Sequence, residues 1–267
     1  MSFNLKIFAK DTCKSLCLDK SFAVLFSIFL ISCAQESPVE SPIIVPENSN
    51  LSEEVEIPED PILEDPIVEE EIVAVEDVDG NAYYSIKIGE LEWLSANLQT
   101  KKFKNGDNIP QIQDDEEWVK AGDAGKPAWC YYEDDAEKGA KYGIIYNYHA
   151  VTDPRGLAPD GWHVATTEEF EATDDFGSNM GIKMKSTTGW EKDGNGDNST
   201  GFNGLAGGYR YNFGPYNQEG LTGYFWCIGE INDIMGPPYW NLTYNLDGLL
   251  GFACPAGSGL YVRCVKD

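Results

Sequence analysis

The stretch Thr200–Arg210 reads TGFNGLAGGYR, and it shows how the second half of the chain is built. Glycine is unfavourable inside helices, and four of these eleven residues are glycine. No convincing helical period follows Gly177, so we predict short strands joined by long Gly- and Asn-rich loops there. Helices are predicted only before that point. This order favours a single α+β domain with few short helices, antiparallel strands and long irregular loops, rather than alternating βαβ units.

Capping residues and turn signals place the individual elements. The sequence Val78-Asp79-Gly80-Asn81 is typical of a hairpin turn and separates two runs that favour strands. Thr166, followed three residues later by Glu169, forms a capping box, which predicts a helix that stops at Gly177. The predicted strands span residues 72–76, 83–88 and 91–94, and the predicted helices span residues 114–122, 134–142 and 166–177.

Residues 1–32 have the pattern of a bacterial export signal. Four lysines precede the apolar run Ser21–Ser32, which is too short to span about 30 Å of hydrocarbon. The sequence Leu30-Ile31-Ser32-Cys33 resembles the lipobox of bacterial lipoproteins, whose cysteine is acylated and becomes the mature N-terminus. Acyl chains on Cys33 would anchor the protein, because each buried CH2 contributes about 0.8 kcal/mol. The alternative is an ordinary cleaved signal with a chance cysteine.

Residues 33–70 have the composition of a stalk. Six prolines interrupt this segment, and residues 34–78 hold fifteen Asp or Glu and no Lys or Arg. Proline-rich segments with one sign of charge are extended and do not bury enough apolar surface to fold. We therefore expect a disordered acidic stalk anchored at Cys33, followed by one folded domain over residues 71–267. Ala34 fits sorting to the outer membrane, so we expect a lipoprotein of the cell envelope, exposed at the cell surface.

The charge balance excludes one class of partner. The chain holds 45 acidic and 19 basic residues, a net charge of −26, and much of the excess lies in the stalk. Nucleic-acid binding needs a basic surface that neutralises phosphates, so we expect no nucleic-acid partner. The same charge disfavours an electrostatic attachment to anionic lipids, which leaves the lipid on Cys33 as the expected membrane contact.

Several blocks of the chain keep the order and spacing of a known family. They are Ile88-Gly89 with Trp93-Leu94 and Asn97-Leu98, Tyr142–Asn147, Ala158–Val164, Thr200–Arg210 and Tyr261–Asp267. Together they resemble the Fibrobacter succinogenes major paralogous domain, which is common in exported proteins of Bacteroidetes-type bacteria. The resemblance covers roughly residues 78–267. It implies a fold related to C-type lectin-like domains and to formylglycine-generating enzymes, and it implies no particular activity.

The predicted folded domain contains four cysteines, which export to an oxidising compartment allows to pair. Four cysteines permit three full pairings, and Cys254 and Cys264 are close enough in sequence to bridge a terminal hairpin. The family that the chain resembles often has a cysteine at the position of Ala158, which implies a partner for the C-terminal cysteine. Without it, Cys264 pairs with Cys254 or Cys227, or stays free. The four residues are Cys130, Cys227, Cys254 and Cys264.

Aromatic residues crowd the region between residues 190 and 244. Aromatic faces stack on sugar rings, and Tyr and Trp also carry a polar group. Core packing is the alternative, and we expect it for Tyr209, Phe225 and Trp226, which lie on predicted strands. The candidate ligand-binding residues lie in loop-like stretches and are Trp190, Tyr211, Tyr216, Tyr239, Trp240 and Tyr244.

The loop 193–198 spaces oxygen-bearing side chains at alternate positions. Calcium takes six to eight oxygen ligands, and such a loop supplies some of them. A helix-loop-helix calcium hand needs a Gly where Asn198 stands and a Glu where Gly204 stands, so that motif is excluded. A looser calcium site and a polar Asx/Gly turn remain the two alternatives. The candidate calcium ligands are Asp193, Asn195, Asp197 and Asn198.

The sequence shows no recognisable catalytic motif. His149 and His163 form no helical His-x-x-x-His pair, and no nucleophile elbow is present. We expect a buried, hydrogen-bonded role for His163. The leading hypothesis is a lipid-anchored binding protein that recognises glycans or a protein partner through loop aromatics. The alternatives are a structural component of a surface adhesin and an enzyme of the formylglycine-generating type.

Overall fold

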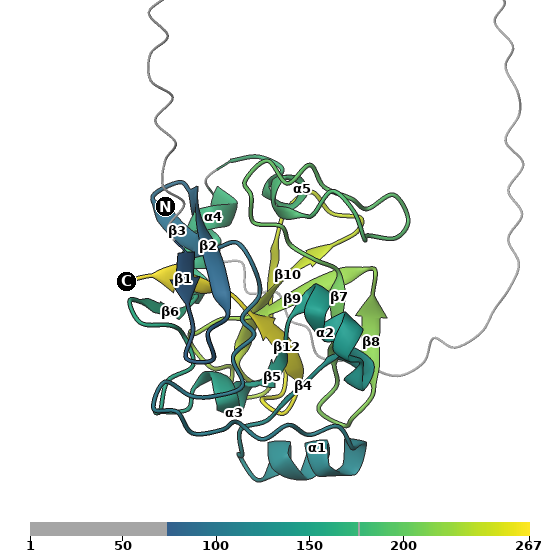
Figure 1. Ribbon diagram of the computed structural model, residues 1–267. Helices are drawn as coiled ribbons and strands as arrows, with labels where there is room; N and C mark the ends of the chain where they lie inside the picture. The colour runs from purple at the N-terminus through teal and green to yellow at the C-terminus, as the bar shows by residue number, and fades with distance from the viewer. Residues whose placement is uncertain (1–73, 176) are drawn as a thin grey trace, which may run out of the picture. The chain divides into compact units, whose positions relative to one another are not determined.

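Two β-sheets organise the residues that the computed structural model describes, 74–175 and 177–267 (Figure 1). Cys33, the predicted export signal 1–32 and the predicted stalk 33–70 lie outside the described residues. Short helices and long loops surround the sheets, and most strand pairs are antiparallel, so the predicted α+β class is confirmed. Within the described ranges, no helix has the length and apolar character needed to cross a membrane.

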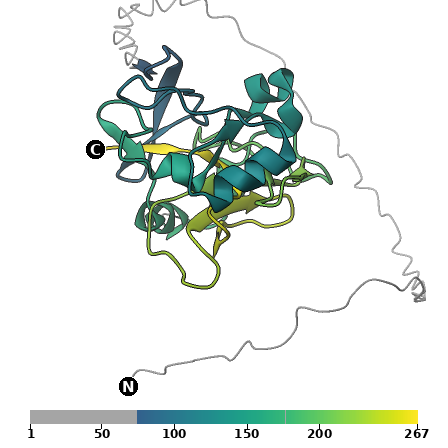
Figure 2. The ribbon, with the colours of Figure 1, turned by 90° about the horizontal axis from the view of Figure 1, so that it is seen from below.

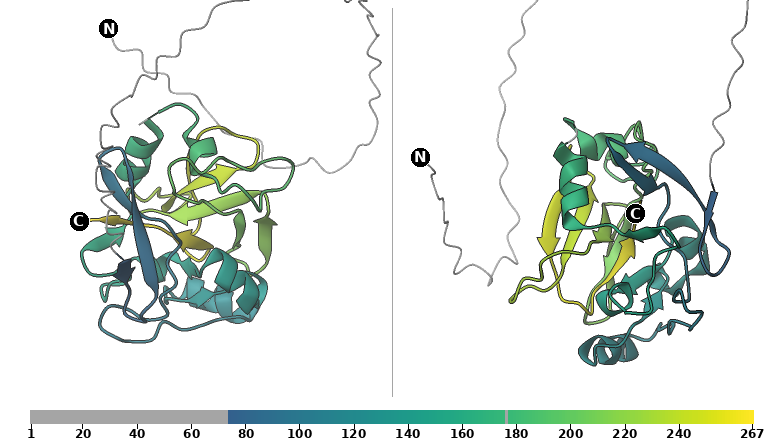
Figure 3. Two further views of the ribbon diagram at one scale, coloured as in Figure 1. Left: turned by 45° about the horizontal axis from the view of Figure 1, so that its top comes forward. Right: turned by 90° about the vertical axis from the view of Figure 1, so that its left-hand side faces the viewer.

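The smaller sheet joins the start of the described chain to its end. Its order is β1-β2-β3-β13-β6, and all its pairs are antiparallel. Val265 lies opposite both Trp93 and His163, so the last strand is clamped between two earlier ones. The left view of Figure 3 shows the yellow C-terminal strand beside the blue N-terminal ones. The strands are β1 (Ala74–Glu76), β2 (Ala82–Ile88), β3 (Leu91–Leu94), β6 (Trp162–Val164) and β13 (Cys264–Lys266).

The larger sheet forms the centre of the domain. Its order is β11-β10-β9-β7-β12-β5-β4, and β8 pairs with β7. Most pairs are antiparallel, but β9 runs parallel to both β7 and β12. The strands are β4 (Trp129–Cys130), β5 (Ile145–Asn147), β7 (Gly207–Arg210), β8 (Tyr216–Glu219), β9 (Thr222–Trp226), β10 (Pro238–Thr243), β11 (Leu250–Ala253) and β12 (Gly259–Val262).

The helices begin where the sequence places capping side chains. The Oδ1 atom of Asp114 accepts the Glu117 N–H at 3.0 Å at the start of α1. Thr166 and Glu169 bond reciprocally, Thr166 Oγ1 accepting at 3.2 Å and Glu169 Oε2 at 2.7 Å, which is the predicted capping box. The helices are α1 (Asp115–Asp123), α2 (Ala136–Tyr142), α3 (Tyr148–Val151), α4 (Thr167–Asp175) and α5 (Met180–Met184), with a 3-10 turn at Tyr132–Asp134. The helix α1, at the bottom of Figure 1, comes to the front in Figure 2.

A buried arginine ties the two sheets together. Arg263, the residue between β12 and β13, is 1% exposed, and its guanidinium lies 4.2 Å from the centroid of the Phe202 ring. It donates from Nε to Asn97 Oδ1 at 2.7 Å, and from Nη1 to the Leu94 carbonyl at 2.8 Å. The Asn203 carbonyl accepts a third bond at 3.3 Å. Burial lowers the pKa of Arg263 to about 9, so the group is still charged at neutral pH.

Replacement of Arg263 by Ala is expected to lower the free energy of unfolding by about 3 kcal/mol or more. The change removes the donor from two buried acceptors, Asn97 Oδ1 and the Leu94 carbonyl, and from a partly buried one, and it opens a cavity beside Phe202. Urea denaturation followed by tryptophan fluorescence measures the loss. Lys266→Ala is the control, because it removes only an exposed ion pair with Glu92, worth about 1 kcal/mol or less. Equal losses for the two variants would contradict the anchoring role of Arg263.

Candidate ligand-binding face

Six aromatic side chains form a continuous stripe across the larger sheet. The centroids of neighbouring rings lie 4.5 Å apart at the closest, between Tyr211 and Phe213, and 6.1 Å apart at the widest, between Tyr239 and Phe252. The intermediate steps measure 4.6, 4.7 and 5.5 Å, so each ring contacts the next. We call this stripe the aromatic face; its members are Tyr209, Tyr211, Phe213, Tyr224, Tyr239 and Phe252.

Strand register explains why these rings meet. The parallel pairing of β7 with β9 sets Tyr209 beside Tyr224. The antiparallel pairing of β9 with β10 makes Tyr239 a diagonal neighbour of Tyr224, and Phe252 is the direct partner of Tyr239 on β11. Side chains alternate between the two faces of a strand, so four adjacent strands contribute one ring each to the same face.

The β7–β8 hairpin holds the end of the stripe in place. Gly214 has a φ of 117°, which favours glycine, and its N–H donates to the Tyr211 carbonyl at 3.0 Å. The fully buried Arg210 donates from Nε to the Gly214 carbonyl at 2.7 Å and from Nη2 to Asp115 at 2.7 Å. The hairpin that carries Tyr211 and Phe213 is therefore bonded to the start of α1 through one guanidinium.

A cavity of about 290 Å³ opens on the aromatic face. None of the described side chains that line it is charged. Burial raises the pKa of Tyr209, Tyr224 and Tyr239, so their hydroxyls stay neutral and can both donate and accept hydrogen bonds. Phe213 and Phe252, at the two ends of the stripe, are 59% and 50% exposed. The cavity thus offers aromatic surface, neutral hydroxyl groups and one exposed apolar ring, Phe213, whereas Phe252 lies outside its lining. Its lining residues are Tyr209, Tyr211, Asn212, Phe213, Tyr224, Tyr239, Cys254, Pro255, Ser258 and Leu260.

The six aromatic residues that the sequence predicts to bind a ligand lie at different sites in the structure. Tyr211 and Tyr239 lie on the aromatic face. Trp190 is only 5% exposed, and its Nε1 donates to Ser186 Oγ at 3.0 Å, which corrects the expectation that it lies in an exposed loop. Trp240 stacks on Phe170 of α4 with ring planes 11° apart, on the core side of the sheet.

The remaining two candidates are held by polar neighbours away from the aromatic face. Tyr216 donates from its hydroxyl to Asp134 Oδ1 at 3.0 Å and packs against Tyr132. The Lys192 ammonium lies 4.8 Å from the ring centroid of Tyr244, which packs against the core. The structure therefore does not gather the six candidates into one site.

Four members of the aromatic face were not predicted as ligand-binding residues. Tyr209 was expected in the core, and it does pack against a core cluster, but its side chain is also partly exposed. Tyr224 lies in the run Thr222-Gly223-Tyr224-Phe225-Trp226, where both faces of the strand carry aromatic residues. Alternation along that run places Phe225 in the core and Tyr224 on the opposite face, and this is the signal that could have found it. Phe213 continues the alternation of Tyr209 and Tyr211, so the same signal could have found it, whereas Phe252 is a lone aromatic between Gly251 and Ala253.

The predicted calcium loop is closed by hydrogen bonds of its own. Asn195 Oδ1 accepts the Trp190 N–H at 3.0 Å, and Asp197 Oδ1 accepts the Ser199 N–H at 2.9 Å. Asn198 Oδ1 accepts the Asn203 N–H at 2.7 Å. Three of the four predicted ligands, all except Asp193, therefore have an oxygen bonded to the backbone, and the Asp197–Ser199 bond has the spacing of an Asx turn. The described residues contain no group of three or more His, Cys, Asp or Glu placed to hold a metal ion.

A lysine ammonium supplies a positive charge beside this loop. Lys185 is 3% exposed, and its Nζ donates to the carbonyls of Thr243 and Leu246 at 3.1 and 3.2 Å. Burial lowers its pKa. The loop 193–198 packs on the backbone of the same residue, because a Cβ at Gly196 would lie 2.5 Å from the Lys185 carbonyl oxygen. Lys185 thus holds the loop after β10 by donating to carbonyls that would otherwise need another donor or a cation.

The structure forms no disulfide among the four cysteines of the described chain, so the candidate Cys254–Cys264 bridge is not present. The expected terminal hairpin does not exist, because β11 pairs with β10 whereas β12 pairs with β5, β7 and β9. Cys264 therefore stays free, which was one of the stated alternatives. Burial raises the pKa of Cys130 and Cys227 to about 11 and that of Cys254 to about 12, so these thiols are poor nucleophiles at neutral pH.

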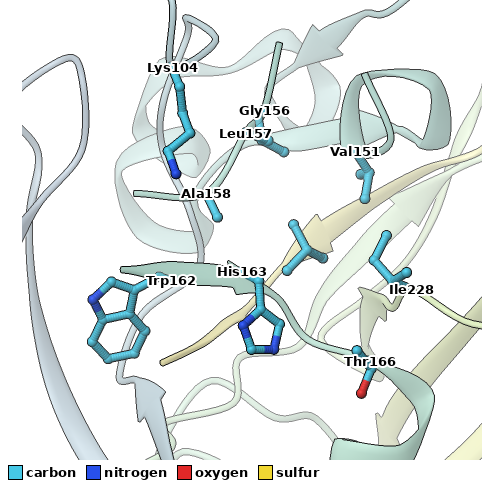
Figure 4. A pocket seen from close by; sticks show the side chains of 10 residues that line it. Lys104, Val151, Gly156, Leu157, Ala158, Trp162, His163, Thr166 and Ile228 are labelled. Carbon is cyan, nitrogen blue, oxygen red and sulfur yellow. The ribbon is translucent and has the colours of Figure 1, made fainter. Parts of the chain in front are cut away.

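His163 lies at a second cavity, of about 300 Å³, whose lining is mostly apolar. Figure 4 shows Val151, Ala158 and Ile228 around its side chain. The ring is partly exposed rather than buried, and both nitrogens face carboxylates at 2.8 Å, Nδ1 with Asp267 and Nε2 with Glu169. Burial alone would lower the pKa of His163, but these two carboxylates raise it above 6.5. A ring with both nitrogens engaged holds the C-terminus to α4 and has no free nitrogen to act as a base.

This clamp predicts a pH dependence of stability. The folded pKa of His163 is raised, so its contribution is fully present below the unfolded value of 6.5 and is lost as pH rises through the folded value. We expect about 0.5 kcal/mol, because the ring is partly exposed to solvent. The measurement compares chemical denaturation of the wild type and His163→Gln above and below pH 6.5. An unchanged pH profile in the variant would show that the clamp contributes nothing.

Comparison of the sequence with known protein families identifies one family. The model of the Fibrobacter succinogenes major domain matches residues 86–266, which is more than half of the chain. No match was found among curated proteins or among solved structures. The matched span contains every element from β3 to β12, together with Arg263 and the whole aromatic face. The chain therefore belongs to the Fibrobacter succinogenes major domain family.

Proposed function

We propose that the protein is a glycan-binding module and that the aromatic face is its ligand surface. The observation that carries the proposal is the contiguous stripe of six rings, which opens into a cavity without charged side chains. The C–H faces of sugar rings stack on aromatic rings, and sugar hydroxyls find partners in Tyr hydroxyls. Core packing does not account for Phe213 and Phe252, which stay largely exposed.

The charge of the site narrows the class of glycan. Residues 79–267 hold 28 Asp or Glu and 15 Lys or Arg, so the domain itself disfavours anionic ligands, and the cavity supplies no basic side chain to compensate. It also supplies no carboxylate that would pair with an amino sugar. The proposed ligand is therefore a neutral glycan, bound by stacking and by hydrogen bonds to uncharged groups.

Substitution of single rings tests this proposal. Tyr224→Ala and Tyr239→Ala are each expected to weaken binding of a neutral glycan about tenfold, because one stacking contact contributes about 1–1.5 kcal/mol. A glycan array identifies the ligand, and calorimetry on the hit measures the change. Tyr84→Ala is the matched control, because Tyr84 is 56% exposed on β2 and is not part of the aromatic face.

The same array, run in calcium and again in chelator, separates two modes of binding. Binding of a neutral glycan by stacking is expected to persist in chelator, since the lining of the cavity contains no carboxylate to hold calcium. Loss of binding in chelator would instead favour a calcium site at the loop 193–198. No binding in either buffer would contradict the glycan proposal.

We also propose that a lipid on Cys33 anchors the module to the outer membrane, with the acidic segment 33–70 as a spacer that exposes it at the cell surface. The support is the sequence Leu30-Ile31-Ser32-Cys33 after a short apolar run. We expect the wild type to incorporate labelled palmitate and to sediment with membranes, and Cys33→Ala to do neither. Retention of the label and of membrane sedimentation by Cys33→Ala would contradict the anchor.

A further inference from the structure

The strand β11 is an edge of the larger sheet without the usual protection. Within the described part of the chain it pairs with β10 alone. Its sequence, Leu250-Gly251-Phe252-Ala253, has no charged residue and no proline, the devices that normally block edge pairing. Of the other edge strands, β1 and β8 each carry a glutamate, and β4 and β6 are mostly buried. The side chain of Phe252 is 50% exposed, so both the backbone and the side chain of this edge face solvent.

A cavity of about 380 Å³ adjoins this edge, where α4 packs against β10. Its lining includes Trp240 and Phe252, which lie on opposite faces of the sheet at this edge, and two acidic residues, Glu171 of α4 and Glu230 of the loop before β10. Both carboxylates belong to exposed residues, and neither has an ion-pair partner in the described ranges. Aromatic rings with nearby carboxylates form the environment that a Lys or Arg side chain prefers.

We propose that β11 binds an extended basic segment of a partner polypeptide, which adds to the larger sheet as a further strand. Backbone hydrogen bonds to the edge give affinity, and a Lys or Arg side chain enters the cavity between Glu171 and Glu230, over Trp240. The backbone edge selects a polypeptide, because a glycan offers no matching ladder of amide groups. The carboxylates select a basic segment, which disfavours a second copy of this acidic chain.

This site differs from the proposed glycan surface in what it recognises. The carboxylates of Glu171 and Glu230 line this cavity and do not line the cavity of the aromatic face. The two sites share Tyr239 and Phe252, which belong to the aromatic face and also line this cavity. Changes to Glu171 and Glu230 leave the six rings intact, so they test the inference separately from glycan binding.

The test uses the full 267-residue chain and a capped octapeptide of alternating lysine and valine as the probe. Binding is measured by calorimetry at peptide concentrations up to about 1 mM. Hydrogen exchange then reports the protection of the β11 amides, residues 250–253. Two control peptides are included: one has glutamate in place of lysine, and the other has N-methylated backbone amides, which cannot donate to the edge.

We expect the lysine–valine peptide to bind and to protect β11 amides, and both control peptides to fail. The double variant Glu171→Gln and Glu230→Gln is expected to bind about tenfold more weakly. Glu168→Gln is the matched control, since Glu168 is exposed on the same helix but does not line the cavity. Absence of binding, equal binding by the N-methylated peptide, or protection elsewhere but not at β11 would each overturn the proposal.

Discussion

The buried guanidinium of Arg263 is the constraint on which the arrangement of the two sheets depends. Burying a charge costs free energy unless its donors are satisfied, and here backbone carbonyls and one amide satisfy them without a carboxylate. The residue lies between Val262, which ends β12 in the larger sheet, and Cys264, which begins β13 in the smaller sheet. The chain crosses from one sheet to the other at this residue, and its hydrogen bonds fix the crossing to β3 and to the loop before β7.

The amide of Asn97 extends this constraint to the helices. Its Oδ1 accepts from Arg263 and its Nδ2 donates to the carbonyl of Tyr142, the last residue of α2, at 2.7 Å. Gly143 follows with a φ of 89°, and a Cβ there would lie 2.9 Å from the Asn97 Cβ. The close approach at this point requires glycine, so the turn from α2 into β5 is set by the same cluster that joins the sheets.

Local signals in the sequence located the longer helices and the first strands, but not the shortest helices, such as α3, nor the partners of each strand. The capping residues Asp114 and Thr166 fixed the starts of α1 and α4, because a cap acts within one helical turn. The helix α5 was not predicted, since five residues are too few to show a period. The predicted Cys254–Cys264 disulfide was wrong because the two cysteines are close in sequence but follow different strand pairings. Cys254 comes directly after β11, which pairs with β10, and Cys264 begins β13, which pairs with β6 and β3.

The aromatic face depends on strand register, which explains why the position of residues in loops was a poor guide to it. In β9, Phe225 faces the core and contacts Phe170, whereas Tyr224 on the other face contacts Tyr209 and Tyr239. A single run of aromatic residues therefore packs on both faces of the sheet, because Trp226, on the same face as Tyr224, is fully buried. Loss of the Tyr224 ring removes a contact of the stripe and some of the packing on that face, while the core on the Phe225 side keeps its packing. The position of each ring in the strand thus decides which of the two core clusters it supports.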